Sequence, residues 1–135
     1  MQRKMYIKYF DDLKEGEPGI LISGDVETLE LLQNAFLQLF YKNTDNINIS
    51  NLSFVKPIKN FQLIASVYKK NKGMKRENKD KFYWRLTSSK WFEFAEMISE
   101  LKKGPSHQYF DIESDDLLII ISNGEYSEKW VGWTE

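Results

Sequence analysis

The only histidine of this 135-residue chain, His107, lies close in sequence to the acidic residues Asp111 and Glu113. An imidazole that is oriented by a carboxylate can act as a general base, so an enzyme centred on His107, hydrolase-like or ligand-binding, is one interpretation. The nearby serines do not lie in a nucleophile-elbow sequence. These serines are Ser106, Ser122 and Ser127. We therefore expect no catalytic residue, and we interpret His107 as a structural link between a helix and a sheet or as part of a binding surface.

The sequence offers little for metal binding. With no cysteine and a single histidine, a transition-metal site would have to rely on carboxylates. Asp111, Glu113 and Asp115 alternate as calcium ligands do, but the central glycine and the final glutamate of an EF-hand loop are missing. We expect no metal site and no cofactor.

Charge is distributed unevenly along the chain, although the formal total is only −1. Residues 56–103 hold 13 basic and 5 acidic side chains, whereas residues 111–135 hold 1 basic and 7 acidic ones. An acidic surface attracts a basic partner and accelerates its association, although acidic side chains in a turn can also be merely solvated. The predicted partner-binding residues are Asp111, Glu113, Asp115, Asp116, Glu125 and Glu128, together with His107 and Tyr126.

The basic residues are concentrated in residues 69–81, where seven bases accompany two acids. Lysines beside aromatic residues can bind nucleic acid, but Phe82 and Trp84 fall on the buried side of a predicted strand, which leaves only Tyr83 for stacking. We favour a solvated hairpin loop, with an acidic protein or ligand surface and a nucleic-acid-binding module as alternatives. The net negative charge of the chain argues against nucleic acid. The basic residues singled out are Lys69, Lys70, Lys72, Lys75 and Arg76.

Length and composition predict one domain that covers residues 1–135. Hydrophobic residues make up 41% and aromatic residues 15% of the chain, which is enough for a packed core. The lack of cysteine excludes disulfides and agrees with a reducing compartment. The N-terminus does not resemble a signal peptide, and the longest apolar run, residues 117–121, is too short to cross a bilayer. We expect a cytoplasmic protein that does not contact the membrane.

Two segments follow the same order of strand, capping residue and amphipathic helix. The first comprises a strand at residues 19–23 and a helix at about residues 26–41. The second comprises a strand at residues 82–87 and a helix at about residues 90–103. The capping residues include Asp25 and Thr87.

The other predicted elements are strands, and residues 43–51 are interpreted as a loop. The first strand pairs with residues 19–23, and the last two form a hairpin whose second strand is apolar on both faces and therefore central in its sheet. The order ββα, then two or three strands, α and ββ predicts an α+β fold. In it, two main helices pack on a mostly antiparallel sheet of about six to seven strands. The predicted strands not yet named cover residues 5–10, 52–55, 61–68, 107–112 and 117–122.

A tryptophan pair, Trp130 and Trp133, lies near the C-terminus of the sequence. Such a pair can form a strap over the core, or it can be an exposed anchor of an interface. The sequence leaves both interpretations open.

Three stretches near the C-terminus carry a resemblance to known proteins. They are Gly104-Pro-Ser-His107-Gln108-Tyr109, Asp115-Asp116 and Ile121-Ser122-Asn-Gly124-Glu125-Tyr126. The pattern resembles that of small bacterial proteins, some of which look like immunity proteins of polymorphic or contact-dependent toxin systems. The resemblance implies a cytosolic α+β protein that binds one cognate toxin tightly and has no activity of its own.

The sequence thus favours a non-catalytic protein-binding domain, and most specifically an immunity protein. Many toxins are nucleases with basic clefts for phosphates, and an acidic C-terminal surface would complement such a cleft. We expect a toxin, with a nuclease as the class that fits, as the partner. We expect neither a nucleic acid nor a membrane as a partner.

Overall fold

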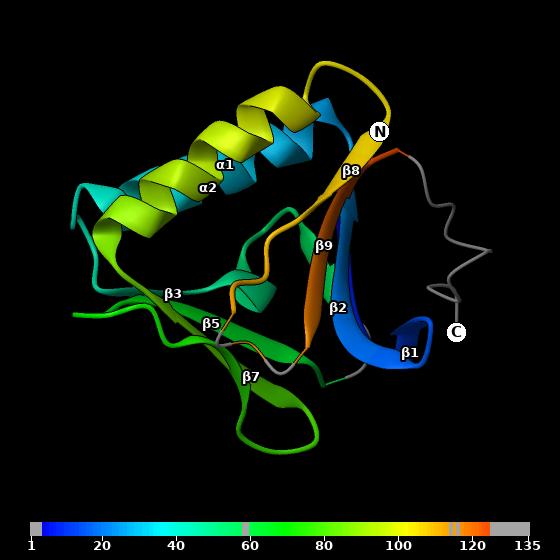
Figure 1. Cartoon of the computed structure of the whole chain (residues 1–135). Coiled ribbons are helices and arrows are strands. Elements are labelled where there is room, and N and C mark those ends of the chain that lie inside the picture. The colour runs from blue at the N-terminus through cyan, green and yellow to red at the C-terminus, as the bar shows by residue number, and fades with distance from the viewer. Residues whose placement is uncertain (1–3, 58–59, 114, 116, 125–135) are drawn as a thin grey trace.

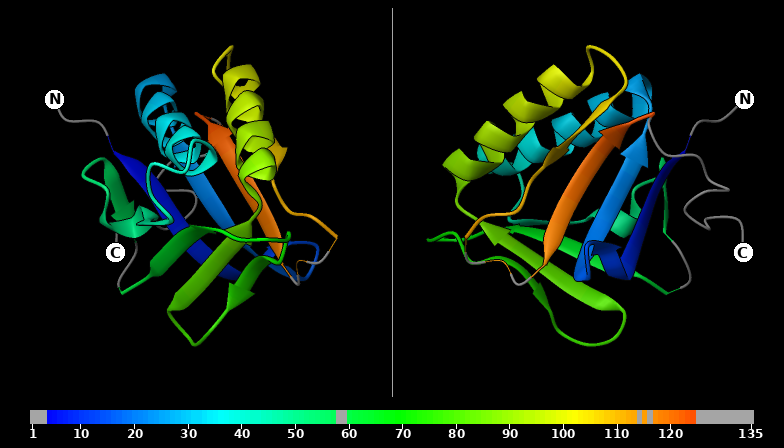
Figure 2. Two further views of the ribbon diagram at one scale, coloured as in Figure 1. Left: turned by 90° about the vertical axis from the view of Figure 1, so that its left-hand side faces the viewer. Right: turned by 45° about the vertical axis from the view of Figure 1, so that its right-hand side comes forward.

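The structure of the chain is a computed structural model that describes residues 4–57, 60–113, 115 and 117–124. Two β-sheets and a pair of helices surround one core. Figure 1 shows the helices above, one sheet standing beside them and the other sheet below. Figure 2 shows the same three groups from two further directions, with the two helices side by side. The α+β class predicted from the sequence is confirmed.

The first sheet, sheet A, has the strand order β4-β1-β2-β9-β8. Strands β1 and β2 are antiparallel, as are β8 and β9, and both pairings were predicted. The pairings of β2 with β9 and of β1 with β4 are parallel. The strands of sheet A are β1 (Met5–Lys14), β2 (Glu17–Gly24), β4 (Val55–Pro57), β8 (Ser106–Tyr109) and β9 (Leu118–Asn123).

The second sheet, sheet B, has the strand order β3-β5-β7-β6. Strands β5 and β7 are parallel, and β6 pairs antiparallel with β7. The prediction that residues 69–81 form a hairpin loop is therefore wrong, because these residues contain strand β6. The predicted loop at residues 43–51 likewise contains β3 and a short 3₁₀ helix. The strands of sheet B are β3 (Asn46–Asn48), β5 (Gln62–Val67), β6 (Gly73–Arg76) and β7 (Lys81–Leu86), and the 3₁₀ helix is η1 (Ile49–Asn51).

The prediction of one mostly antiparallel sheet of six to seven strands is wrong in detail. The described residues form nine strands in two mixed sheets. The physical reason is that alternation of apolar and polar residues assigns the two faces of a strand but does not identify its neighbours. The central position of β9, predicted from its two apolar faces, is confirmed by its place between β2 and β8.

Each helix begins at a predicted capping residue. Asp25 precedes α1 (Val26–Phe40), and its carboxylate accepts a hydrogen bond from the Thr28 backbone N–H at 2.9 Å while the Thr28 hydroxyl accepts from the Asp25 N–H at 3.0 Å. Thr87 precedes α2 (Ser88–Leu101) and caps it with a single bond, in which its hydroxyl accepts from the Lys90 N–H at 3.3 Å. The predicted apolar faces of both helices point into the core.

The core lies between the two sheets and the helix pair, and aromatic side chains occupy its centre. Trp84 of β7 and Trp91 of α2 are completely buried, and their ring centroids are 5.1 Å apart. Phe36 of α1 lies 4.9 Å from the Trp91 ring. The Trp91 indole N–H donates to the Ser66 carbonyl of β5 at 3.0 Å, so one residue links α2 to sheet B.

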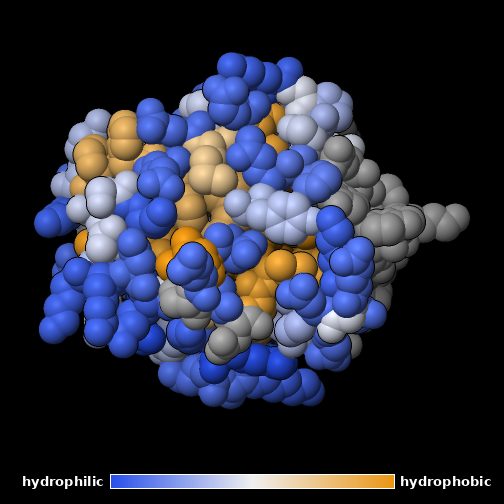
Figure 3. Space-filling view, viewed as in Figure 1, coloured by the Kyte–Doolittle hydropathy of each residue, from blue (hydrophilic) through white to orange (hydrophobic). Residues whose placement is uncertain are grey.

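Each sheet turns its second face away from this core. On sheet A, the outward side chains Leu21 and Ile120 are only 1% and 3% exposed, and Tyr6, Phe10 and Leu13 pack against them. On sheet B, most outward side chains are charged or polar, and the half-buried Ile64 of β5 is an apolar exception. Figure 3 shows hydrophilic residues along the lower edge of the molecule, where sheet B lies, and apolar surface near the centre of the same view. Among the described residues, no helix is long and apolar enough to cross a membrane.

Candidate protein-binding surface

The short strand β8 forms one edge of sheet A and contains the predicted site residue His107. It is held in place by Asn123 at the end of β9, whose buried side-chain amide donates to the carbonyls of Leu101 at 2.9 Å and Gly104 at 3.1 Å. The Leu101 carbonyl lies at the end of α2, where helix carbonyls lack partners within the helix, and Gly104 follows three residues later. Asn123 therefore fixes the corner from which β8 begins.

His107 and Tyr109 lie on the same outward face of β8, as residues two apart on a strand must. Their ring centroids are 5.9 Å apart in an edge-on arrangement. The Tyr109 hydroxyl accepts a hydrogen bond from the Lys14 ammonium at 2.5 Å, and that ammonium lies 5.2 Å from the ring centroid. Tyr109 is 37% exposed. We refer to His107, Tyr109 and Lys14 as the edge cluster.

The structure also brings His107 next to one of the candidate serines. The register pairs His107 with Ser122 of β9, so the two residues occupy adjacent positions on one face of sheet A. Ser122 is completely buried, and no described residue provides a hydrogen-bond partner for its hydroxyl. A hydroxyl in that position is not open to a substrate. Ser106 uses its hydroxyl to donate to the Gly104 carbonyl at 3.0 Å.

Two predicted acidic residues bind backbone groups within the connection from β8 to β9. Asp111 accepts a hydrogen bond from the Ile119 N–H at 3.4 Å. One oxygen of Asp115 accepts from the Ile112 N–H at 2.7 Å, and the other accepts from the Met74 N–H of β6. Asp115 thus joins this connection, which belongs to sheet A, to the edge strand of sheet B.

Burial raises the pKa of the Asp115 carboxyl above its ordinary value, although the two backbone N–H donors act in the opposite direction. The neighbouring Asp111 carboxylate adds to the increase, and Lys75 opposes it. A half-buried carboxylate that accepts hydrogen bonds from two backbone N–H groups has a structural role.

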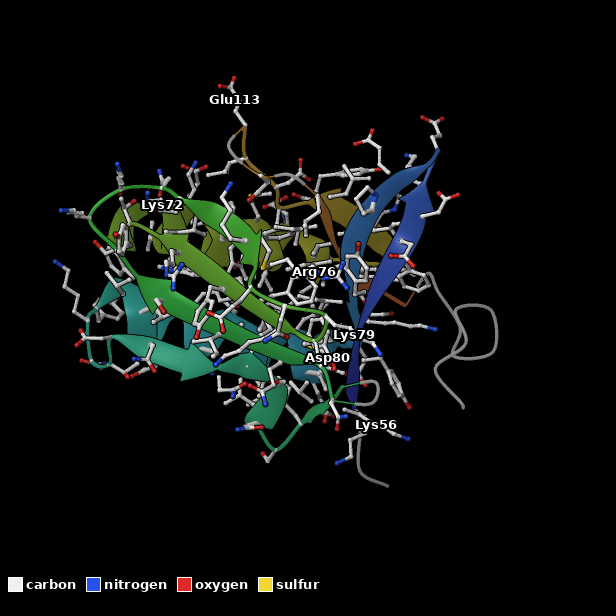
Figure 4. All side chains as sticks on the ribbon, turned by 90° about the horizontal axis from the view of Figure 1, so that it is seen from below. Lys56, Lys72, Arg76, Lys79, Asp80 and Glu113 are labelled. Atoms are coloured by element: carbon white, nitrogen blue, oxygen red, sulfur yellow. The ribbon has the colours of Figure 1, made fainter. Side chains whose placement is uncertain are left out.

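Glu113 is the exposed member of the predicted acidic set within the described part of the chain. Figure 4 shows its side chain at the margin of the molecule, pointing away from sheet B. Other predicted residues lie outside the described residues, and the structure does not place them. They are Asp116, Glu125, Tyr126, Glu128, Trp130 and Trp133, as well as Ser127.

The predicted basic residues follow the course of β6 and the turns on either side of it. Lys69, Lys70 and Lys72 are exposed before the strand, and Lys75 and Arg76 lie within it. Figure 4 looks onto sheet B from below, with Lys72 at one end of the sheet and Arg76, Lys79 and Asp80 gathered toward the other.

Arg76 differs from the other basic residues of this segment because two nitrogens of its guanidinium group donate hydrogen bonds to backbone carbonyls. Its guanidinium carbon lies 4.2 Å from the Tyr9 ring centroid, and its N–H groups donate to the carbonyls of Asn78 at 3.2 Å and Lys79 at 2.9 Å. Since Tyr9 belongs to β1, Arg76 helps to close the seam between the two sheets.

The sequence interpretation did not single out Lys14, Tyr109 or Arg85 as site residues. Lys14 is 95 residues away from Tyr109 along the chain, so no local pattern could reveal their contact. Arg85 lies on the polar side of the predicted strand at residues 82–87, and that alternation was the available signal for an outward cation.

The described residues contain no group of three or more histidine, aspartate or glutamate side chains that could hold a metal ion.

The chain matches no family model, no curated protein and no solved structure in comparisons with known proteins.

Proposed function

We propose that this chain is a non-catalytic, immunity-type binding domain that neutralises one cognate toxin by direct contact and docks through the edge of sheet A at β8. The observation that carries the proposal is the edge cluster, in which the exposed Tyr109 stands beside His107 on one outward face. The immunity part of the proposal comes from the resemblance of residues 104–109, 115–116 and 121–126.

The chemistry of the edge cluster supports protein binding. Tyrosine is enriched among the residues that contribute most to interface affinity, because it offers a large contact area and a polar group at a low entropic cost. The ammonium of Lys14 bonds the Tyr109 hydroxyl and restrains the ring before any partner arrives. A side chain restrained in this way loses less freedom on binding.

Charge around the edge cluster favours a basic partner. The exposed Glu113 and the half-buried Asp111 follow β8 directly. Carboxylates at the rim of an interface mainly increase the association rate, and this effect weakens with salt. A nuclease toxin with a basic cleft is the class of partner that fits.

The test is coexpression of the chain with the product of the gene next to its own in a bacterial host. We expect that product to arrest growth alone and to be bound and neutralised by the chain. Tyr109→Ala should weaken the complex by about 30-fold, the size of a 2 kcal/mol interface residue. The matched control is Tyr41→Ala, because Tyr41 is 63% exposed at the end of α1. A neighbouring product that is neither toxic nor bound, or equal affinities of the two variants, would contradict the proposal.

A further inference from the structure

Sheet B carries a second surface, on the face that points away from the core. Lys81, Tyr83 and Arg85 alternate with the buried residues of β7 and therefore project outward together. The register places Lys75 of β6 opposite Tyr83 and Gly73 opposite Arg85. We refer to Lys75, Lys81, Tyr83 and Arg85 as the basic face.

Arg85 has the geometry of an anion-binding residue. Its guanidinium carbon lies over the Tyr83 ring, 4.3 Å from the ring centroid. A guanidinium that contacts a ring in this way still has N–H donors for a carboxylate, in a fork that matches its two oxygens. Within the described part of the chain, no carboxylate forms a salt bridge with Arg85.

Lys81 extends the positive surface toward the other end of β7. Its ammonium lies 5.3 Å from the Tyr83 ring centroid, and a hydrogen bond to Tyr83 raises the pKa of Lys81 above its ordinary value. Glu77 lies 3.9 Å from this ammonium, with both side chains exposed enough for solvent to screen the pair. Lys81 therefore remains a cation at this end of the face.

The surroundings of the basic face reinforce its charge. Residues 60–87 contain eight basic and two acidic side chains. The acids, Glu77 and Asp80, both lie near the turn between β6 and β7, at the end opposite Lys72 (Figure 4). The end that holds Arg85 and Lys72 thus has the higher density of positive charge, and a field of one sign attracts partners of the other.

We propose that the basic face docks an acidic, extended segment of a partner protein, with Arg85 as the anchor for one of its carboxylates. Lys81 and Arg85 are four residues apart on a strand, which corresponds to about 13 Å. An extended chain presents every second side chain to one side, so carboxylates four positions apart match Lys81 and Arg85, and one midway between them faces Tyr83 and Lys75. This surface lies on sheet B and uses no residue of the edge cluster, so it stands apart from the toxin-binding proposal.

An acidic protein segment fits this face better than a nucleic acid does. Stacking of a base needs an open aromatic ring, and the Tyr83 ring already contacts Arg85 and Lys81. The whole chain carries a net charge of −1, whereas domains that bind nucleic acid are usually strongly basic. Carboxylates need only the exposed edges of the cations.

The experiment measures the fluorescence anisotropy of a labelled peptide of alternating glutamate and serine, about twelve residues long so that it spans the strand. The full chain is titrated at low salt. We expect saturable binding that weakens as salt rises from about 50 to 200 mM. Arg85→Gln should weaken binding roughly tenfold, as loss of one charge-assisted contact does, and Arg85→Lys should weaken it less.

The matched control is Lys103→Gln, which removes the same charge from an exposed site after the end of α2. Circular dichroism of each variant establishes that it is folded. Absence of saturable peptide binding, or equal losses in Arg85→Gln and Lys103→Gln, would overturn the proposal. Tighter binding of a single-stranded oligonucleotide of similar length would also overturn it and would assign the face to nucleic acid. Because the probe is not the toxin, failure here leaves the test of the edge cluster unaffected.

Discussion

Sheet A and sheet B each turn one face toward the common core, but their outward faces differ in composition. Sheet A places Leu21 and Ile120 at the centre of its outward face, where both are almost completely buried. Sheet B places Tyr83 and Arg85 at the equivalent position, with cations on either side. The comparison teaches that the centre of the outward face of sheet A serves stability and leaves only its β8 edge exposed to a partner, whereas the centre of the outward face of sheet B is itself available for one.

The largest expected effect is a difference in the free energy of unfolding between substitutions on the outward faces of the two sheets. Leu21→Ala should lower the free energy of unfolding by about 2–5 kcal/mol, because it removes a buried side chain and leaves a cavity. Ile64→Ala, on the half-buried outward face of β5, should cost clearly less. Urea denaturation of both variants measures the difference. Equal losses would show that the two outward faces are packed alike.

Much of the fold was predictable because its signals are local. Apolar spacing identified the buried sides of both helices, and the alternation of Phe82, Trp84 and Leu86 identified the buried side of β7. The side chains of Asp25 and Thr87 act within three residues of their own positions, so capping could be recognised from the sequence. Each of these features depends on residues that are close along the chain.

The division into two sheets was not predictable, because it depends on contacts between distant segments. The parallel pairing of β2 with β9 joins residues about one hundred positions apart, and alternation contains no information on such a partner. Strand β6 was missed because its sequence, Gly-Met-Lys-Arg, is mostly polar and short. The structure therefore places Lys75 opposite Tyr83, which the interpretation as a loop could not do.

The next effect concerns the corner that holds β8 in place. Asn123→Ala should cost about 1–3 kcal/mol, because the buried Leu101 carbonyl loses its side-chain donor and the Gly104 carbonyl keeps only the Ser106 hydroxyl. Asn46→Ala, on exposed β3 of sheet B, is the control and should change stability by no more than about 0.5 kcal/mol. Thermal unfolding of both variants tests this difference between the sheets. A large loss at Asn46 instead would contradict it.

The link between the two sheets should respond to pH through Asp115. Because its folded pKa is raised, the folded state holds a proton that the unfolded state has released, between the ordinary carboxyl pKa and the raised one. Between these two pKa values, the contribution of Asp115 to the free energy of unfolding falls as pH rises. This contribution is fully present only below the ordinary carboxyl pKa. Urea denaturation at several pH values, with Asp115→Asn lacking this slope, provides the measurement. A wild-type slope of the opposite sign relative to the variant would contradict the assignment.

The smallest expected effects are the losses of stability on substitution of two arginines of sheet B, Arg76 and Arg85. Arg76 is stacked on Tyr9 and bonded to two carbonyls, so Arg76→Gln should cost about 1 kcal/mol of stability. Arg85 stacks only on Tyr83 of its own strand, and Arg85→Gln should change stability by no more than about 0.5 kcal/mol. Urea denaturation of the two variants, which carry the same substitution, measures this contrast. If Arg85→Gln proved as destabilising as Arg76→Gln, its guanidinium would be part of the fold, and the distinction between a structural centre of the outward face on sheet A and an available one on sheet B would fail.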